Sequence, residues 1–314
     1  MNDSKMINKI KIQTEKMNIN NIKRTNAYLY FFDDYPEIKW SFLASMVSRN
    51  AGWNMTDLKT DTYQKLLSIK MVRYLFMTYE RANWFIFSDA YPQLLIYHFS
   101  IMQKQPLFHL LKYFYVSTFM IDEWMHFWLH KNKNRLLYAQ IINEQNLIQK
   151  PVIEEPFFKW RVFHNIPYLL QEKIHLNAVL FPTLSGSLYG LSIKKFTDVT
   201  ERINTGKKLA SILFDERLYQ EFLAFAKKVY PDGTRREYEQ FLKKKYITAD
   251  HLEEIYPNIT HENKYREDWY EPKNFLSVWW KKDMVQPQPI GDRFYKKRRT
   301  IEKISGLTGI LKNG

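Results

Sequence analysis

Polar side chains gather in two short segments of a chain that is otherwise rich in aromatic and aliphatic residues. The first segment is Ser48–Lys59, around one glycine and one tryptophan, and the second lies inside the apolar run Phe76–Tyr97. Buried groups of this kind must pair with one another or with a ligand, because each unpaired group costs roughly 1–3 kcal/mol. We therefore expect eight side chains to converge in space as one polar centre: Arg49, Asn50, Asn54, Asp57, Glu80, Arg81, Asn83 and Asp89.

This polar centre has two interpretations. As a ligand pocket, its Arg and Asn side chains would orient a polar molecule, and Glu80 or Asp89 would act as a general base if burial raised its pKa. As internal scaffolding, its buried ion pairs would fix helix packing, and Asp57 would interact with a helix dipole. Because Arg49 and Asp57 flank Gly52, we expect a glycine-containing turn that lets these two side chains pair.

Two Glu-x-x-His motifs have the spacing of metal ligands on helices. Such motifs on two helices, with a carboxylate from each of two others, form the di-metal cofactor site of helical bundles. The alternative is that the two matches arise by chance in a chain with 8 histidines, and that histidines near a helix C-terminus interact with the helix dipole. The candidate ligands are Glu123 with His126, Glu172 with His175, and Glu37 and Glu80 as the additional carboxylates.

The C-terminal part of the chain alternates aromatic and basic residues. Aromatic rings can stack on nucleobases while basic side chains meet phosphates, and the same composition suits an anionic membrane surface. The alternative is that Trp279 and Trp280 pack back on the helical body while the basic residues are only solvated. The candidate polyanion-binding residues are Lys281, Lys282, Arg293, Lys296, Lys297, Arg298 and Arg299.

The net charge of +14 is concentrated at the two ends of the chain. Residues 1–25 carry six basic and two acidic side chains, and residues 273–314 carry ten basic and three acidic ones, which leaves +3 for the rest. Basic ends attract an anionic partner such as nucleic acid, an anionic membrane surface or an acidic protein. The chain has no cysteine, which excludes disulfides, thiolate metal sites and a cysteine nucleophile.

Helical periodicity dominates and no convincing strand pattern alternates, so the sequence predicts an all-α fold. We expect a single domain of about ten helices, with a basic N-terminal segment at 1–25, a helical core domain at 26–256 and a less ordered, basic tail at 257–314. An apolar stripe predicts a helix over Asp61–Phe87, and Pro92 should end or kink it. Further helices are expected at Pro92–Gln103, Pro106–Lys131, Asn134–Gln149, Tyr168–Phe181, Ile193–Phe214, Glu216–Val229, Arg235–Lys244 and Ala249–Ile255.

A resemblance to a known family rests on six segments: Arg24–Tyr28, Pro36–Trp40, Ser45–Lys59, Glu80–Trp84, Asp89–Leu94 and Ile141–Asn146. They resemble the YppC-like proteins of bacilli over residues 24–245, and Ser45–Lys59 is the most specific part. Ala51 stands where we expect a second glycine, and its methyl group disturbs little unless the backbone needs a positive φ. The family is a domain of unknown function, so the resemblance implies a cytosolic bacterial protein and supplies no catalytic residue.

The chain also lacks the common catalytic signatures. It contains no phosphate-binding P-loop, no G-x-G-x-x-G, no H-E-x-x-H and no G-x-S-x-G. Residues 1–20 do not form a signal peptide, and the uncharged stretch Ile174–Ile193 is a poor transmembrane helix because proline and glycines interrupt it.

We expect a cytoplasmic, non-catalytic protein that contacts an anionic partner, including a membrane surface, through its basic ends. The alternative is an enzyme or small-molecule binder that uses the polar pocket, with or without a metal; the oligomeric state stays open.

Overall fold

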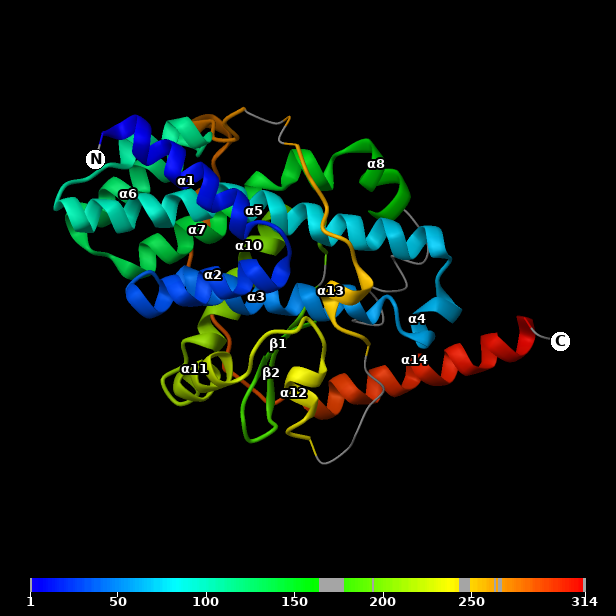
Figure 1. Ribbon diagram of the computed structural model, residues 1–314. Helices are drawn as coiled ribbons and strands as arrows, with labels where there is room; N and C mark the ends of the chain where they lie inside the picture. Colours follow the sequence, from blue (N-terminus) through cyan, green and yellow to red (C-terminus); the bar gives the residue numbers. More distant parts are fainter. Residues whose placement is uncertain are drawn as a thin grey trace.

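The computed structural model describes residues 2–163, 178–193, 195–242, 249–262, 264 and 267–312 (Figure 1). Helices dominate these residues, and the prediction of an all-α fold in a single domain is confirmed. A small two-stranded sheet is the only β-structure in the described part of the chain. Within the same ranges, no helix combines the length and the apolarity that crossing a bilayer requires.

The described residues contain thirteen α-helices, against the expected ten or so, and they are numbered as in Figure 1. Short 3-10 or π-helical segments also occur, at Phe108–Phe114, Gln149–Ile153, Lys159–Phe163, Pro272–Asn274 and Ser277–Trp280. The helices are α1 (Asp3–Met17), α2 (Asn21–Asp34), α3 (Lys39–Asp57), α4 (Asp61–Leu66), α5 (Ile69–Gln103), α6 (Thr118–His130), α7 (Lys133–Leu147), α8 (Pro156–Phe158), α10 (Val199–Leu213), α11 (Tyr219–Lys228), α12 (Arg236–Glu239), α13 (Leu252–Ile255) and α14 (Gly291–Lys312).

Local sequence explains where many of these helices begin. In six of them the residue before the first turn is Asn, Ser or Asp, and its side chain accepts a hydrogen bond from a backbone N–H of that turn. Such a cap satisfies one of the donors that a helix start leaves free, and it typically stabilises by about 1 kcal/mol. The capping residues are Asn2, Asn20, Ser68, Ser117, Asn132 and Asp198.

Helix α3 runs without interruption through Gly52, so the expected turn at this glycine is wrong. The glycine has a packing role instead. A Cβ atom at Gly52 would lie 3.3 Å from the Cα of Gly233, so the missing side chain lets a distant segment approach the helix. Arg49 and Asp57 therefore do not meet across a turn, and each pairs with a residue of that distant segment.

Helix α5 also continues where a break was expected. It spans 35 residues and includes Pro92, so the prediction of separate helices before and after this proline is wrong. A proline inside a helix costs about 3 kcal/mol because a hydrogen bond is lost and the ring crowds the preceding turn. Around it, Phe87, Tyr91 and Leu94 are buried in the core, and this packing outweighs the local penalty.

The two-stranded sheet replaces part of an expected helix. Strands β1 (Ala178–Pro182) and β2 (Leu188–Ser192) pair antiparallel, so the expected helix Tyr168–Phe181 is wrong over 178–181, and its first part lies outside the described residues. All five residues of β1 are buried, and a short continuous apolar run cannot be distinguished from a buried helix by its periodicity. Asn50 of α3 fixes the strand, because its amide donates to the carbonyl of Leu180 at 2.8 Å and accepts from the Leu180 N–H at 2.7 Å.

The main hydrophobic core lies where α2, α3, α5, α6 and α7 meet. Trp40, Phe87, Trp124 and Ile141 are each almost completely buried there, and aromatic contacts connect the helices. Tyr28 of α2, for example, packs edge-on against Trp40 of α3 with ring centroids 5.4 Å apart. The bundle therefore holds rigidly the helix faces that carry the candidate polar residues.

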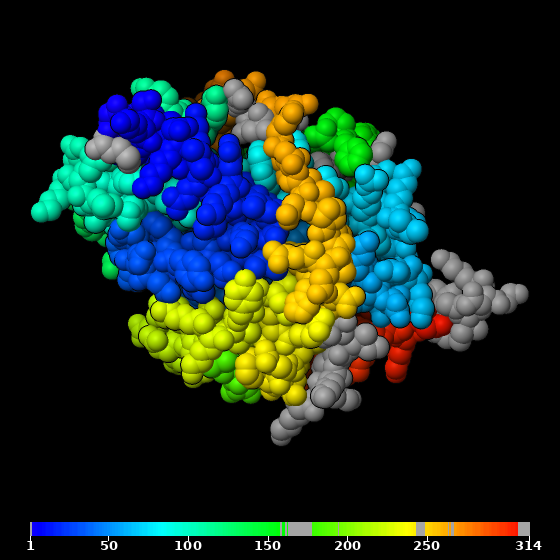
Figure 2. All heavy atoms as spheres, viewed as in Figure 1, coloured from blue at the N-terminus to red at the C-terminus, as the bar shows by residue number. Residues whose placement is uncertain are grey.

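A second, smaller core joins the end of α3 to the start of α5. Met55, Val72 and Phe76 are buried there together with Leu252 of α13. Figure 2 shows the gold segment around residues 250–262 lying beside the sky-blue segment that contains α4 and the start of α5. We call residues 255–262 the strap, and its Tyr256 stacks face to face on Phe76 of α5 with ring centroids 3.8 Å apart.

Candidate functional site

Arg49 of α3 forms a buried ion pair with Glu237 of α12. Its Nε donates to Glu237 Oε2, and its guanidinium covers the ring of Phe225 at 4.7 Å. The other oxygen of Glu237 accepts from the backbone N–H groups of Asp232 and Gly233, at 2.9 and 2.7 Å. The Glu237 carboxylate thus pairs with the backbone donors of the turn before α12 and, through Arg49, holds this turn against α3.

Asp57 and Asn54 hold a second arginine of the same segment. Arg235 donates to Asp57 Oδ2 at 2.7 Å, to Asn54 Oδ1 at 2.9 Å and to the hydroxyl of Tyr238 at 2.8 Å. Arg235 is almost completely buried, so these bonds replace most of its hydration. Two residues of α14 bind the same short helix, because Arg298 and Tyr295 donate to Glu239 of α12 at 2.7 and 3.2 Å.

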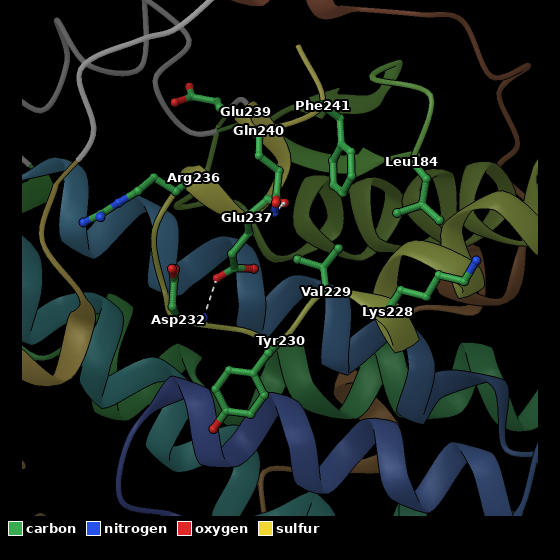
Figure 3. Close-up of a pocket in the computed structure, with 10 residues that line it drawn as sticks. All are labelled: Leu184, Lys228, Val229, Tyr230, Asp232, Arg236, Glu237, Glu239, Gln240 and Phe241. Carbon is green, nitrogen blue, oxygen red and sulfur yellow. Dashed lines mark hydrogen bonds between the residues drawn. The ribbon is translucent and has the colours of Figure 1, made fainter.

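A pocket of about 860 Å³ opens beside α12 (Figure 3). Burial raises the pKa of Glu237 to about 7, while the Arg49 guanidinium acts in the opposite direction. Arg49, Asn54 and Asp57 do not line this pocket, whereas Glu237 lines it together with Asp232, whose N–H Glu237 accepts from. The lining residues are Leu184, Lys228, Val229, Tyr230, Asp232, Arg236, Glu237, Glu239, Gln240 and Phe241.

Glu80 pairs with an arginine from another helix. Both carboxylate oxygens accept from Arg24 of α2, at 2.6 and 2.9 Å, and the two side chains are buried. The Arg24 Nε donates to Asn18, and His261 of the strap lies 3.6 Å from Glu80. Burial raises the pKa of Glu80, but the charge and hydrogen bonds of Arg24 outweigh it, so the pKa is lowered overall.

The neighbours of Glu80 on α5 have separate local partners. Arg81 donates to the backbone carbonyl of Pro151 at 3.1 Å and covers the ring of Phe85. Asn83 donates to the carbonyl of Tyr79, one turn earlier, at 2.8 Å. Both side chains therefore serve local packing around α5 rather than a shared centre.

Asp89 is a buried carboxyl group that is held by two neutral amides. Its Oδ2 accepts from the side chains of Gln93 at 2.6 Å and Asn143 at 2.7 Å. Burial raises its pKa to about 7, and the two amides only partly oppose this. Glu144 of α7 is similar: it accepts from the indole N–H of Trp40, and burial raises its pKa to about 7.

The eight residues expected in one polar centre thus fall into several groups. Among the described residues, no hydrogen bond or ion pair directly joins the α3 members to the α5 members. The nearest connection runs through α2, where Asn21 accepts from Arg24 at 2.7 Å and donates to the Ser48 carbonyl at 3.0 Å. Sequence reasoning missed the partners Arg24, Arg235 and Glu237; the only signal was the charged run 235–239 after a turn.

The metal candidates are only partly described. Glu123 makes two hydrogen bonds to Arg135, both 2.7 Å, and the rings of His126 and His130 lie 4.4 Å apart. Glu172 and His175 lie outside the described residues, so the predicted site is not tested. Of the additional carboxylates, Glu37 accepts from the Tyr97 hydroxyl, and Glu80 binds Arg24 as described above. Within the described ranges no group of three or more His, Asp or Glu could hold a metal.

The C-terminal aromatic residues pack on the helical body. Trp279 is buried and donates to the Thr200 hydroxyl at 3.0 Å, and Trp280 lies under the guanidinium of Arg135 at 4.6 Å. Helix α14 packs against α4 and buries Tyr295.

The candidate polyanion-binding residues differ in their surroundings. Arg298 is largely buried against Glu239, and Lys297 is half-buried beside β2. The other five candidates are exposed: Lys281, Lys282, Arg293, Lys296 and Arg299.

Comparison with known proteins agrees with the resemblance inferred from the sequence. Residues 16–298 match a family model described as a protein of unknown function, DUF2515. The chain is 43% identical to the uncharacterized protein YppC of Bacillus subtilis (strain 168) over 309 residues, which are 98% of this chain and 97% of that protein. No solved structure matches the chain.

Proposed function

The chain belongs to the DUF2515 family of proteins of unknown function, and we propose that it is a non-catalytic protein that binds the surface of an anionic phospholipid membrane. The binding face is built by α14, α4 and the first two turns of α5. The observation that carries the proposal is the exposed basic side of a helix whose other side is packed into the fold.

Helix α14 is divided into a buried and a basic side. Tyr295, Ile301 and Ser305 are buried, whereas the basic residues of the other side are exposed. At 100° per residue, these exposed basic residues fall within an arc of about 120°. A folded helix that presents its positive charges in one direction can meet a flat anionic surface without reordering. The basic side consists of Arg293, Lys296, Arg299 and Lys303.

The neighbouring elements add both charge and apolar surface. Helix α14 packs against α4, and α5 begins three residues after α4 ends. Lys65 of α4 and Lys70 of α5 are exposed, and Ile69, the first residue of α5, is 91% exposed. A large exposed aliphatic side chain among basic residues favours a lipid surface. A membrane has hydrocarbon next to its phosphates, which such a side chain can enter, and nucleic acid does not.

The buried polar residues support the non-catalytic part of the proposal. Every member of the expected polar centre has a protein partner, and Arg49, Asp57 and Glu80 each connect two different helices or segments. Such pairs fix the packing of helices, which is the scaffolding role. The basic N-terminal helix α1 lies at the other side of the molecule from α14 (Figure 1) and does not belong to the same face.

Co-sedimentation with lipid vesicles tests the proposal. We expect the protein to bind vesicles that contain phosphatidylglycerol and not vesicles of phosphatidylcholine alone. The combined variant Arg293→Glu, Lys296→Glu, Arg299→Glu should lose at least about tenfold in affinity, since each basic residue near an anionic surface contributes about 1 kcal/mol. A matched triple reversal on α1, of Lys5, Lys11 and Lys16, should keep the affinity. Equal binding by the α14 variant, or preference for RNA over vesicles, would refute the proposal.

A further inference from the structure

An apolar groove lies beside the proposed binding face, between the start of α5 and the strap. Its volume is about 700 Å³, which is within the range of pockets that bind small molecules. On α5 the groove follows one helix face, since its residues recur three or four positions apart. Helix α5 contributes Val72, Arg73, Phe76 and Met77 to the lining, and the strap contributes Tyr256 and Ile259.

The floor of the groove is hydrocarbon and aromatic. Val72 and Phe76 belong to the second core, and Leu67 and Met77 pack against it from the groove side. The hydroxyl of Tyr256 donates to the backbone carbonyl of Met55 at 2.9 Å, so the polar end of this side chain is already paired and its ring is the part that lines the groove. A polar ligand would find few partners on this floor, whereas a flexible alkyl chain would bury its surface there.

The charged residues of the lining are both basic. Lys59 lies 5.4 Å above the Tyr256 ring, and Arg73 is exposed on the first turns of α5. Neither side chain is ion-paired within the described residues, and the lining contains no Asp or Glu. The exposed Ile69 lies at the rim. An apolar floor with two cations is complementary to a molecule with a hydrocarbon chain and one anionic head.

We propose that this groove binds a single acyl chain whose anionic headgroup is held by Arg73 and Lys59. Free fatty acid and an acyl chain of an anionic phospholipid share this chemistry. The inference rests on the proposed membrane function for its biological setting, because the groove adjoins the α4 and α5 part of that face. Its chemistry is nevertheless tested separately, with monomeric ligands in the absence of vesicles.

The test is a titration of the full chain with cis-parinaric acid, a fluorescent fatty acid. We expect saturable binding of one probe per chain. Arg73→Glu should weaken binding about tenfold, since the headgroup would lose a charge-assisted contact and meet a like charge instead. Met77→Trp should fill the groove and abolish saturable binding, and Ile259→Trp serves as a second groove-filling variant if the first melts early. Lys133→Glu, an exposed charge reversal at the start of α7, should leave the affinity unchanged.

Competition experiments identify which headgroup the groove binds, and whether the acyl chain comes from a free fatty acid or from a phospholipid. Palmitate should displace the probe at least about tenfold better than hexadecanol, which has no charge. Stronger displacement by dioctanoyl phosphatidylglycerol than by palmitate would assign the groove to phospholipid, and the reverse order to free fatty acid. Absence of saturable binding, equal displacement by hexadecanol, or full binding by a folded groove-filled variant would overturn the inference. Failure of the membrane proposal can be distinguished from failure of this one, because the α14 triple variant should lose vesicle binding and keep its affinity for parinaric acid.

Discussion

Arg24 and Glu80 form a bidentate ion pair, with N–O distances of 2.6 and 2.9 Å, in the interior between α2 and α5. The side chains of both residues are almost completely buried. Asn18 and Asn21 accept from the same guanidinium, so the arginine is surrounded by acceptors. This arrangement makes the pair a cross-link between two helices rather than a reactive site, because the hydrogen bonds of both side chains are directed at each other and at neighbouring protein groups.

Removing one partner should be worse than removing both. Glu80→Gln leaves the Arg24 charge buried and unpaired, and we expect it to lower the free energy of unfolding by about 3–5 kcal/mol. The double variant Arg24→Met, Glu80→Gln should be more stable than the sum of the single changes predicts. Urea unfolding of the four proteins measures the coupling. Strict additivity of the single effects would contradict the assignment of this pair as a cross-link.

The sequence located Glu80 but not its partner. Helical periodicity predicted the fold class, and polar residues inside apolar segments correctly marked Arg49, Asp57 and Glu80 as buried. Their partners lie far away in the sequence, 188 positions for Arg49 and Glu237 and 56 for Arg24 and Glu80. Local patterns carry no information on such contacts, so one centre was expected where the fold forms several pairs.

The failures at Pro92 and Gly52 have the same origin. Both residues usually interrupt helices, and the local rule predicted a break or a turn at each. In the fold, Pro92 is buried within α5, and Gly52 leaves space for Gly233 to approach. Tertiary packing determines the backbone conformation at these two positions, and a single sequence does not show that packing.

Gly233 and Gly306 should respond oppositely to alanine. Gly233 has a φ of +79°, and a Cβ there would lie 2.6 Å from the Cβ of Leu252. Gly233→Ala should therefore destabilise the fold by more than about 1 kcal/mol. At Gly306, in α14, an added Cβ would meet no atom within 4 Å, so Gly306→Ala should stabilise by up to about 1 kcal/mol. Thermal unfolding of both variants measures the two shifts, and a loss of stability at Gly306 would argue against a helix there.

Salt should separate the two proposed binding activities. Vesicle binding by α14 is electrostatic, and raising the salt from about 0.1 M to about 1 M shortens the Debye length from about 10 Å to about 3 Å. We expect vesicle binding to be lost over that range. Parinaric acid binding should weaken far less, because its chain is held by apolar contacts that salt does not screen. A parallel loss of both would indicate that the groove contributes little beyond its two charges.

The pH dependence of stability should report the buried carboxyl group of Asp89. Its pKa is raised from 3.8 to about 7 by burial, so between these values the folded state keeps a proton that the unfolded state has lost. The contribution to stability is therefore largest at low pH and is lost as the pH rises through the folded pKa. Asp89→Asn imitates the protonated form, since the amide oxygen can still accept from Gln93 and Asn143.

The variant should consequently be more stable relative to wild type at high pH than at low pH. Between about pH 5 and about pH 8 we expect the difference in unfolding free energy to change by about 3 kcal/mol, because this window covers about two pKa units and each unit corresponds to about 1.4 kcal/mol. Comparing the variant with wild type at each pH isolates Asp89 from Glu144, whose pKa is also raised to about 7 and which is unchanged in both proteins. Urea unfolding at the two pH values provides the measurement. A constant difference would mean that Asp89 is ionised in the folded protein and that a positive charge or a bound cation compensates it.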